Sequence, residues 1–313
     1  MIERAVAFGA GGSLVGVLTE PDPAHSVPGA PAALMWNVGI QHRVGPYRVQ
    51  VDLARELARR GFTSLRFDLS GMGDSEVRQD HRTDQERALD DVREAMALLE
   101  KRRSIGRFLP IGFCSSVDSV HAISLADERI VAACFIEGYA YRTRGFWLHY
   151  PLRTLDWMRW KRRIVRKLPM WISSVASAPQ AVDAVAQDRD GQPPITLATV
   201  FARQYPSRAQ FGFDVHRMAA RGARLLFIYV GGDTDFNYQG QFEETIGGIR
   251  ESESIEVTYY GGADHTFFRP ADRRRAVLCV ADWATRTFAG AKSSTADGAR
   301  SRPEMSLYPD MDA

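Results

Sequence analysis

Short apolar runs alternate with amphipathic segments along the first 138 residues of the chain. Apolar residues recur every three or four positions in the segment 89–99, which is typical of a helix with one buried face. The apolar runs are rich in branched and aromatic residues and have the length of buried strands. Four of them are 30–36, 62–68, 106–113 and 129–138. Strands that alternate with helices in this way predict an α/β fold, with a mostly parallel sheet covered by helices on both faces.

Local signals place several element ends. The first 20 residues predict two strands joined in a hairpin at Gly11 and Gly12. Pro46 is expected to open a helix that Gly61 ends. Thr83 and Glu86 form the pattern T-x-x-E of a capping box, which predicts a helix start there.

The alternation stops near residue 139 and resumes with the apolar runs 223–230 and 254–260 and a last helix around 272–288. Residues 139–220 contain many Trp, Arg and Pro and show no clear strand. We therefore expect an α/β core formed by 1–138 and 221–288, with a mainly helical cap inserted at 139–220. The polar end, 289–313, is expected to be disordered.

Composition narrows the class of protein. The net charge of +2 is too small to indicate nucleic-acid binding. The three cysteines, Cys114, Cys134 and Cys279, form no CxxC pair, which argues against a disulfide framework or a zinc site and indicates a reducing compartment. The chain has no signal-peptide pattern at its start and no apolar run near the roughly 20 residues of a membrane span. We expect a cytoplasmic protein.

The stretch LPIGFCSSVDSV, 109–120, predicts a strand, a sharp turn and the start of a helix. Small residues around a central nucleophile in this context are typical of the nucleophile elbow, G-x-S-x-G. The central position here is Cys114, and Ser116 stands where the second glycine is usual. A dead site and a catalytic serine are the alternatives, but the elbow geometry selects the residue two after Gly112.

Two further polar features follow predicted strands at the same edge of the sheet. The segment GGDTD, 231–235, offers Asp233 and Asp235, and GGADHTFF, 261–268, contains His265. The chain order is nucleophile, acid and histidine, which is the order of the catalytic triad in α/β-hydrolases.

These segments together resemble an α/β-hydrolase with an inserted cap, and they are most similar to the serine-aminopeptidase-like group, including the exosortase-system-associated hydrolases. The likeness lies in NVGIQHRVGPYRVQVDLARELARRGFTSLRFDLSGMGDS (37–75), GFCSS (112–116), GGDTD (231–235) and GADHTFF (262–268). It frames nearly all of 1–138 and 221–288. The resemblance implies the α/β-hydrolase fold, and it makes GMGDS a structural turn that Asp68 and Ser75 stabilise.

The expected triad is Cys114 as nucleophile, His265 as general base and Asp233 as the acid that orients the histidine. Asp235 is the second candidate for the acid. Asp233 is preferred because it follows the predicted strand end at Val230 by three residues, where the family's acid usually falls.

The oxyanion of the reaction needs two N–H donors. The N–H of Ser115 would stand at a helix N-terminus and serve as one donor. The resemblance assigns the second to the N–H of Ile40, which follows Gly39. Gln41 and His42 are expected to line the substrate pocket. No metal or organic cofactor is implied.

A thiol nucleophile favours certain substrates. Thiolate attack on an oxygen ester must expel a poorer leaving group, whereas attack on a thioester is nearly an even exchange. We therefore expect a thioesterase, acyltransferase or cyclase that acts on an acyl thioester. A carboxylesterase or lactonase is the alternative within the same class. A non-catalytic binding or scaffolding protein on a hydrolase fold is the alternative from another class.

The predicted cap carries a basic segment. Residues 142–167 contain nine Arg or Lys and one Asp, with Trp147, Trp157 and Trp160 between them. An acidic acyl carrier protein that delivers a thioester would fit this charge. The alternatives are a solvated helix face and peripheral contact with an anionic membrane surface.

Overall fold

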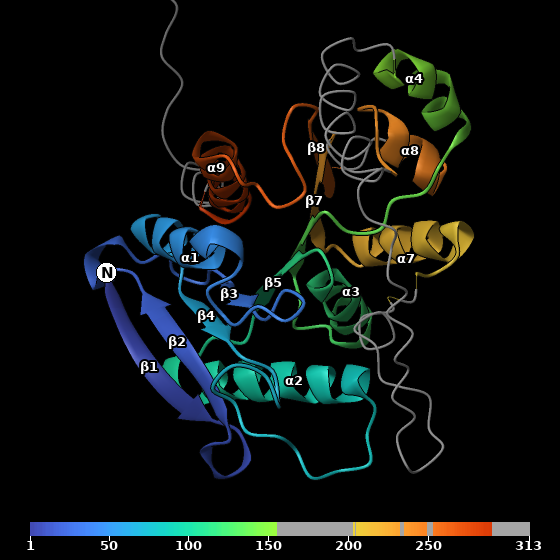
Figure 1. Cartoon of the computed structure of the whole chain (residues 1–313). Helices are drawn as coiled ribbons and strands as arrows, with labels where there is room; N and C mark the ends of the chain where they lie inside the picture. The colour runs from blue at the N-terminus through green and yellow to red at the C-terminus, as the bar shows by residue number, and fades with distance from the viewer. Residues whose placement is uncertain (155–202, 204, 232–234, 249–252, 290–313) are drawn as a thin grey trace, which may run out of the picture.

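The computed structural model describes residues 1–154, 203, 205–231, 235–248 and 253–289 (Figure 1). Within these residues lies one sheet of eight strands in the order β1-β2-β4-β3-β5-β6-β7-β8. The hairpin of β1 and β2 is antiparallel, β2 is antiparallel to β4, and the remaining neighbours are parallel. The strands are β1 (Ile2–Phe8), β2 (Leu14–Glu20), β3 (Ala32–Met35), β4 (Ser64–Phe67), β5 (Phe108–Phe113), β6 (Ala132–Ile136), β7 (Arg224–Val230) and β8 (Ile255–Tyr260).

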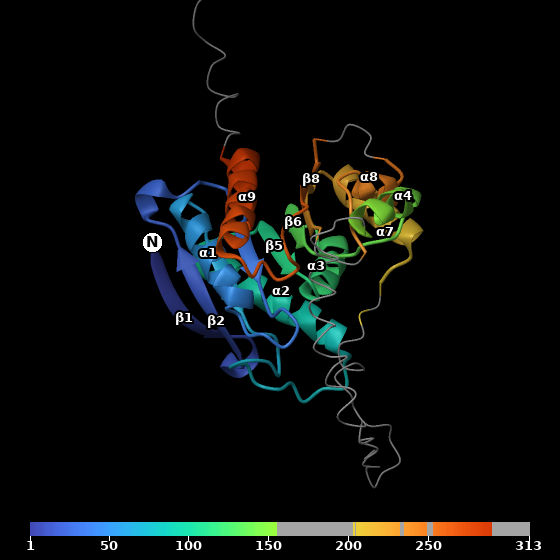
Figure 2. The ribbon, with the colours of Figure 1, turned by 45° about the horizontal axis from the view of Figure 1, so that its top comes forward.

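Helices cover both faces of the sheet (Figures 1 and 2). On one face, α1 (Val49–Arg59) packs against α9 (Pro270–Phe288). On the other lie α2 (Asp84–Arg103), α3 (Ser116–Ala126), α7 (Arg208–Ala220) and α8 (Gln241–Ile246). Each face has its own cluster of buried apolar side chains, with Leu57 and Val280 in one and Val120 and Phe211 in the other. The predicted α/β architecture is confirmed.

Two helix starts were predicted from the sequence, and they differ in outcome. The capping box is confirmed, since the Thr83 hydroxyl accepts from the Glu86 N–H and the Glu86 carboxylate accepts from the Thr83 N–H. The prediction that Pro46 opens α1 is wrong. Pro46 begins a short 3-10 turn instead, and Arg48 has a left-handed backbone (φ 66°), so the α-helix starts at Val49.

The segment between β6 and β7 contains α4 (Arg144–Thr154) and α7 in its described part. Helix α4 packs beside α8, while Phe211, Val215 and Met218 of α7 lie in the core under the sheet. The centre of the predicted cap, 155–202, and the predicted tail beyond Ala289 lie outside the described residues. No helix in the described part of the chain combines the length and the apolar composition that crossing a bilayer requires.

Candidate active site

Cys114 occupies a sharp turn between β5 and α3. Its backbone is left-handed (φ 53°), and its N–H donates to the carbonyl of Ile136 at 2.9 Å. A Cβ at Gly112 would lie 2.8 Å from Cγ2 of Val120 and 3.1 Å from the backbone of Val117. The strand and the helix therefore approach too closely for a side chain at 112, which is the geometry expected of a nucleophile elbow.

The two serines after Cys114 brace the turn. The buried Ser116 hydroxyl accepts from the Phe113 N–H at 2.7 Å and donates to the Phe113 carbonyl at 2.9 Å. The Ser115 hydroxyl accepts from the N–H of Gly39 at 2.7 Å. Ser116, which stands where the motif usually has glycine, thus binds the end of β5. Ser115 ties the turn to the loop after β3.

His265 lies in the loop between β8 and α9, and its Nδ1 is 2.8 Å from Oε2 of Glu137. Glu137 follows β6 directly, with a left-handed backbone (φ 54°) and a fully buried side chain. Its other carboxylate oxygen accepts from the Val230 N–H at 2.6 Å, and its own N–H donates to Ile228 at 2.9 Å. The carboxylate is therefore fixed between β6 and β7 and holds the histidine ring.

The residue before His265 shapes its loop. The Asp264 carboxylate accepts from the backbone N–H groups of Thr266 and Phe268 and from the Thr266 hydroxyl. The His265 ring lies against Phe113, with centroids 6.1 Å apart, and 39% of its side chain is exposed. The ring is thus oriented by packing and hydrogen bonds, yet it can be reached from solvent.

Cys114 and His265 are joined by a side-chain hydrogen bond. Burial raises the pKa of the Cys114 thiol, but the hydrogen bond and the charges of His265 and Arg203 outweigh burial, so the pKa lies below its usual value. The hydrogen bonds with Cys114 and with Glu137 raise the pKa of His265 to about 10. Each group therefore favours the charged form of the other, the thiolate of Cys114 and the imidazolium of His265.

One predicted oxyanion donor, Ser115, lies in this turn, and the other, Ile40, lies on the loop that Gly39 ties to Ser115. The Ser115 N–H forms a hydrogen bond with the Cys114 side chain. Ile40 lies in a tight turn in which the Gln41 N–H donates to the Val38 carbonyl at 3.0 Å. Among the described residues, nothing accepts a hydrogen bond from the N–H of Ile40.

Gln41 and His42, predicted to line the pocket, are both exposed on the loop after β3. The loop is held by buried Asp68, whose Oδ1 accepts from Asn37 Nδ2 at 3.0 Å and from the Arg43 N–H at 2.7 Å. The Ser75 hydroxyl donates to the Asp68 carbonyl at 2.8 Å. The interpretation of GMGDS as a structural turn behind this loop is confirmed.

The acid predicted first, Asp233, lies outside the described residues. Asp235 forms an ion pair with Arg142, with Oδ1 and Nε 2.8 Å apart. Sequence reasoning missed Glu137, although one signal was present. Glu137 is a carboxylate at the end of the apolar run 129–138, and so stands at the edge of the sheet where Cys114 emerges.

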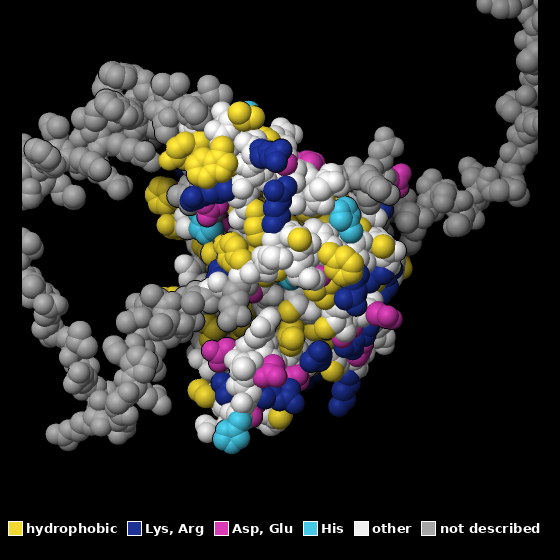
Figure 3. Space-filling view, turned by 90° about the vertical axis from the view of Figure 1, so that its right-hand side faces the viewer, with side chains coloured by type: hydrophobic (Ala, Val, Ile, Leu, Met, Phe, Trp, Pro, Cys, Tyr) yellow, Lys and Arg dark blue, Asp and Glu magenta, His cyan; other side chains and the backbone are white. Residues whose placement is uncertain are grey.

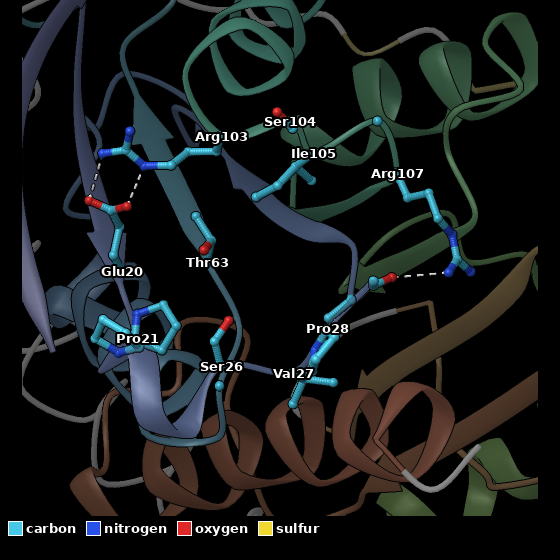
Figure 4. A pocket seen from close by; sticks show the side chains of 15 residues that line it. Glu20, Pro21, Ser26, Val27, Pro28, Thr63, Arg103, Ser104, Ile105 and Arg107 are labelled. Carbon is cyan, nitrogen blue, oxygen red and sulfur yellow. Dashed lines mark hydrogen bonds and ion pairs between the residues drawn. The ribbon is translucent and has the colours of Figure 1, made fainter. Parts of the chain in front are cut away.

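A pocket of about 510 Å³ lies at the opposite edge of the sheet (Figure 4). Its lining comes from residues just before β3, β4 and β5, whereas Cys114 follows the far end of β5. Arg103 is bound there to Glu20, and Arg107 donates to the carbonyl of Gly29 at 3.1 Å. Within the described residues, no three His, Cys, Asp or Glu side chains are grouped so as to hold a metal ion.

No family model and no curated protein sequence matches the chain. Solved structures are similar along nearly its whole length. The esterase domain of a Rhodothermus marinus protein is 18% identical, with a TM-score of 0.51 over 91% of this chain and 99% of that chain. An α/β serine hydrolase without a lid from Xanthomonas campestris is 15% identical, with a TM-score of 0.50 over 94% of this chain and 96% of that chain. The α/β-hydrolase GrgF from Penicillium sp. sh18 is 13% identical, with a TM-score of 0.56 over 92% of this chain and 100% of that chain. This chain therefore has the α/β-hydrolase fold.

Proposed function

We propose that the protein is an enzyme that forms a covalent acyl intermediate on Cys114 and prefers thioester substrates. One observation carries the proposal: the elbow thiol is hydrogen-bonded to His265, whose other ring nitrogen is held by the buried carboxylate of Glu137. A nucleophile, a base and an orienting acid in this arrangement are what acyl transfer requires. Glu137 takes the orienting role here, and Asp233 remains the alternative acid.

The first half of the reaction uses the ion pair as it stands. The Cys114 thiolate attacks the acyl carbonyl, and a C–S bond forms while the carbonyl electrons move to oxygen. The N–H groups of Ser115 and Ile40 are proposed to stabilise this oxyanion. When the intermediate collapses, the leaving thiolate departs and takes a proton from the His265 imidazolium.

The second half needs a base, and acylation supplies one. Acyl-Cys114 is neutral, so the thiolate charge that helps to raise the pKa of His265 is gone. The neutral imidazole can then accept a proton from water, an alcohol or an amine as that group attacks the thioester. Collapse breaks the C–S bond, releases the product and restores the thiolate and imidazolium pair.

A carboxylesterase or lactonase is the second candidate. It is favoured by the similar solved structures, of which one is an esterase domain from Rhodothermus marinus and another an esterase from Pyrococcus furiosus. The Cys114→Ser variant separates the two functions. Serine depends more on the base and forms an ester intermediate, so we expect residual ester hydrolysis and a larger loss with thioesters.

The donor thioester is proposed to arrive on an acidic acyl carrier protein that docks on the basic segment 142–167. The described part of this segment carries Arg142 and Arg144 beside the exposed side chains of Trp147, Leu148 and Tyr150. Figure 3 shows hydrophobic side chains next to Lys and Arg in its upper part, around the position of α4. An anionic membrane surface is the alternative partner.

Intact mass after incubation with short- and long-chain acyl thioesters of coenzyme A tests the catalytic proposal. We expect an acyl adduct on the wild-type chain, none on Cys114→Ala, and a normal adduct on the control Cys279→Ala. A Cys114→Ala protein that still gains the acyl group at the wild-type rate would refute the assignment. A wild-type protein that forms no adduct with thioesters or activated esters would favour a non-catalytic binding protein.

A further inference from the structure

Arg203 is held against the helix that follows the nucleophile. Its Nη2 donates to Oδ1 of Asp118 at 2.6 Å, and its Nε lies 3.1 and 3.2 Å from the two carboxylate oxygens of Asp118. Its guanidinium carbon lies 5.4 Å from the ring centre of Tyr139 and 4.8 Å from that of Tyr205. Only 17% of the side chain is exposed. The guanidinium is therefore fixed in place by one carboxylate and two aromatic rings.

Asp118 connects this guanidinium to the elbow. It lies in the first turn of α3, where its N–H donates to the Ser115 carbonyl at 3.2 Å. Cys114 is the residue before Ser115, and the charge of Arg203 acts on its thiol. Arg203 enters from the end of the segment between β6 and β7, where Tyr205 packs on Tyr139 with ring centres 5.1 Å apart. Arg203 thus brings a cation to the first turn of α3, directly after the elbow.

We propose that Arg203 and Asp118 are positioning residues that set the fraction of Cys114 present as thiolate. Arg203 favours the thiolate, and Asp118 offsets part of that effect. This inference deepens the proposed function, on which it rests, because it concerns the charge state of the same nucleophile.

The other titratable groups around this pair are neutral or already paired. His121 lies one turn after Asp118 on the same helix, α3, and burial lowers the pKa of its imidazole. Tyr139 contacts Asp118, and burial raises the pKa of its phenol above the usual range. On the far side, Cys114 faces His265, which Glu137 holds. Asp214 of α7 is a further carboxylate here, with its Oδ2 3.3 Å from Nε2 of His121. Outside the proposed triad, Arg203 is a charged group of the described residues that acts on the thiol.

The test is the pH dependence of Cys114 alkylation by iodoacetamide, a neutral reagent that needs no substrate. Arg203→Met removes a positive charge near the thiolate, so the midpoint should rise by about 1 pH unit. Asp118→Asn removes a negative charge and leaves Arg203 less compensated, so the midpoint should fall. Arg203→Lys keeps the charge and should stay near the wild type. Alkylation at Cys114 is identified by peptide mass.

Opposite shifts distinguish this role from a structural one, because loosening the site would move both variants in the same direction. Arg129→Met is the matched control, since Arg129 is paired with Asp127 at 2.7 Å near the other end of α3 and should leave the midpoint unchanged. Shifts of the same sign, or none, would overturn the inference. If Arg203→Met fails to fold, the Asp118→Asn variant alone tests the inference. Only the proposed role predicts a lower midpoint of Cys114 alkylation in that variant. Failure of acyl-adduct formation would instead overturn the proposed function and leave these midpoints unaffected.

Discussion

Nδ1 of His265 lies 2.8 Å from Oε2 of Glu137, a residue that follows β6, whereas the acid predicted from the sequence follows β7. The two strands are parallel neighbours, so their carboxyl ends meet at the same edge of the sheet. A carboxylate after either strand can therefore approach the same histidine. The buried position of Glu137 and its second hydrogen bond, from the Val230 N–H, favour it as the orienting group.

The first prediction compares the two acids. Glu137→Gln should slow acylation by about 10³-fold, somewhat less than the roughly 10⁴-fold loss in serine triads, because a thiol with a lowered pKa depends less on the base than a serine hydroxyl does. The amide can still accept from the Val230 N–H, so folding should survive. Asp233→Asn is the matched variant and should have a small effect. Single-turnover acylation with a thioester measures both, and a larger loss in Asp233→Asn would show that the sequence-based assignment was the correct one.

The second prediction concerns the charge coupling between nucleophile and base. The hydrogen bond with Cys114 is the largest cause of the raised pKa of His265, which is about 10. A thiolate favours the imidazolium, so Cys114→Ala should lower the pKa of His265, by at least about 1 unit. The chemical shift of the His265 ring proton against pH measures this. Cys279→Ala is the control, and an unchanged titration in Cys114→Ala would remove the ion pair from the proposed mechanism.

The third prediction concerns the close approach of strand and helix at the elbow. Alanine at 112 would place its Cβ 2.8 Å from Cγ2 of Val120 and 3.1 Å from the Val117 backbone. Overpacking of this kind costs about 1–3 kcal/mol, so Gly112→Ala should lower the free energy of unfolding by that amount and displace Cys114. Gly106→Ala is the control, since a Cβ there meets nothing within 4 Å. Urea unfolding compares them, and equal stabilities would contradict the predicted clash.

The sequence predicted the fold well because its strongest signals are local. Apolar runs and amphipathic spacing gave the alternation of strands and helices, and Gly112 with Cys114 marked the elbow. The start of α1 was misplaced because Pro46 is compatible with both a helix and the 3-10 turn that precedes it. Glu137 was missed because the family's acid usually follows the strand that corresponds to β7, whereas Glu137 follows β6 and keeps the same chain order of nucleophile, acid and histidine. Only the pairing of β6 with β7 shows that a carboxylate upstream of β7 reaches the ring.

The last prediction concerns delivery of the substrate. If an acidic carrier protein docks on the basic segment 142–167, charge attraction should raise its encounter rate, and salt should weaken it. Replacing Lys161, Arg162 and Arg163 with Glu should then raise the apparent KM for a carrier-bound thioester. The same variant should turn over a small neutral thioester almost normally, because the proposed triad is unchanged.

Both substrates are measured at low and high ionic strength with the wild-type and the charge-reversed protein. The matched control is a charge reversal of Lys101 and Arg102 at the end of α2, near the opposite edge of the sheet from Cys114. That control should leave both KM values unchanged, since a carrier cannot present an acyl group to Cys114 from there. Equal effects of the 161–163 reversal on both substrates, or a carrier KM that ignores salt, would remove the carrier. Sedimentation of the same variants with anionic vesicles would then decide whether the basic segment binds a membrane surface, because only such binding would be lost on charge reversal and weakened by salt.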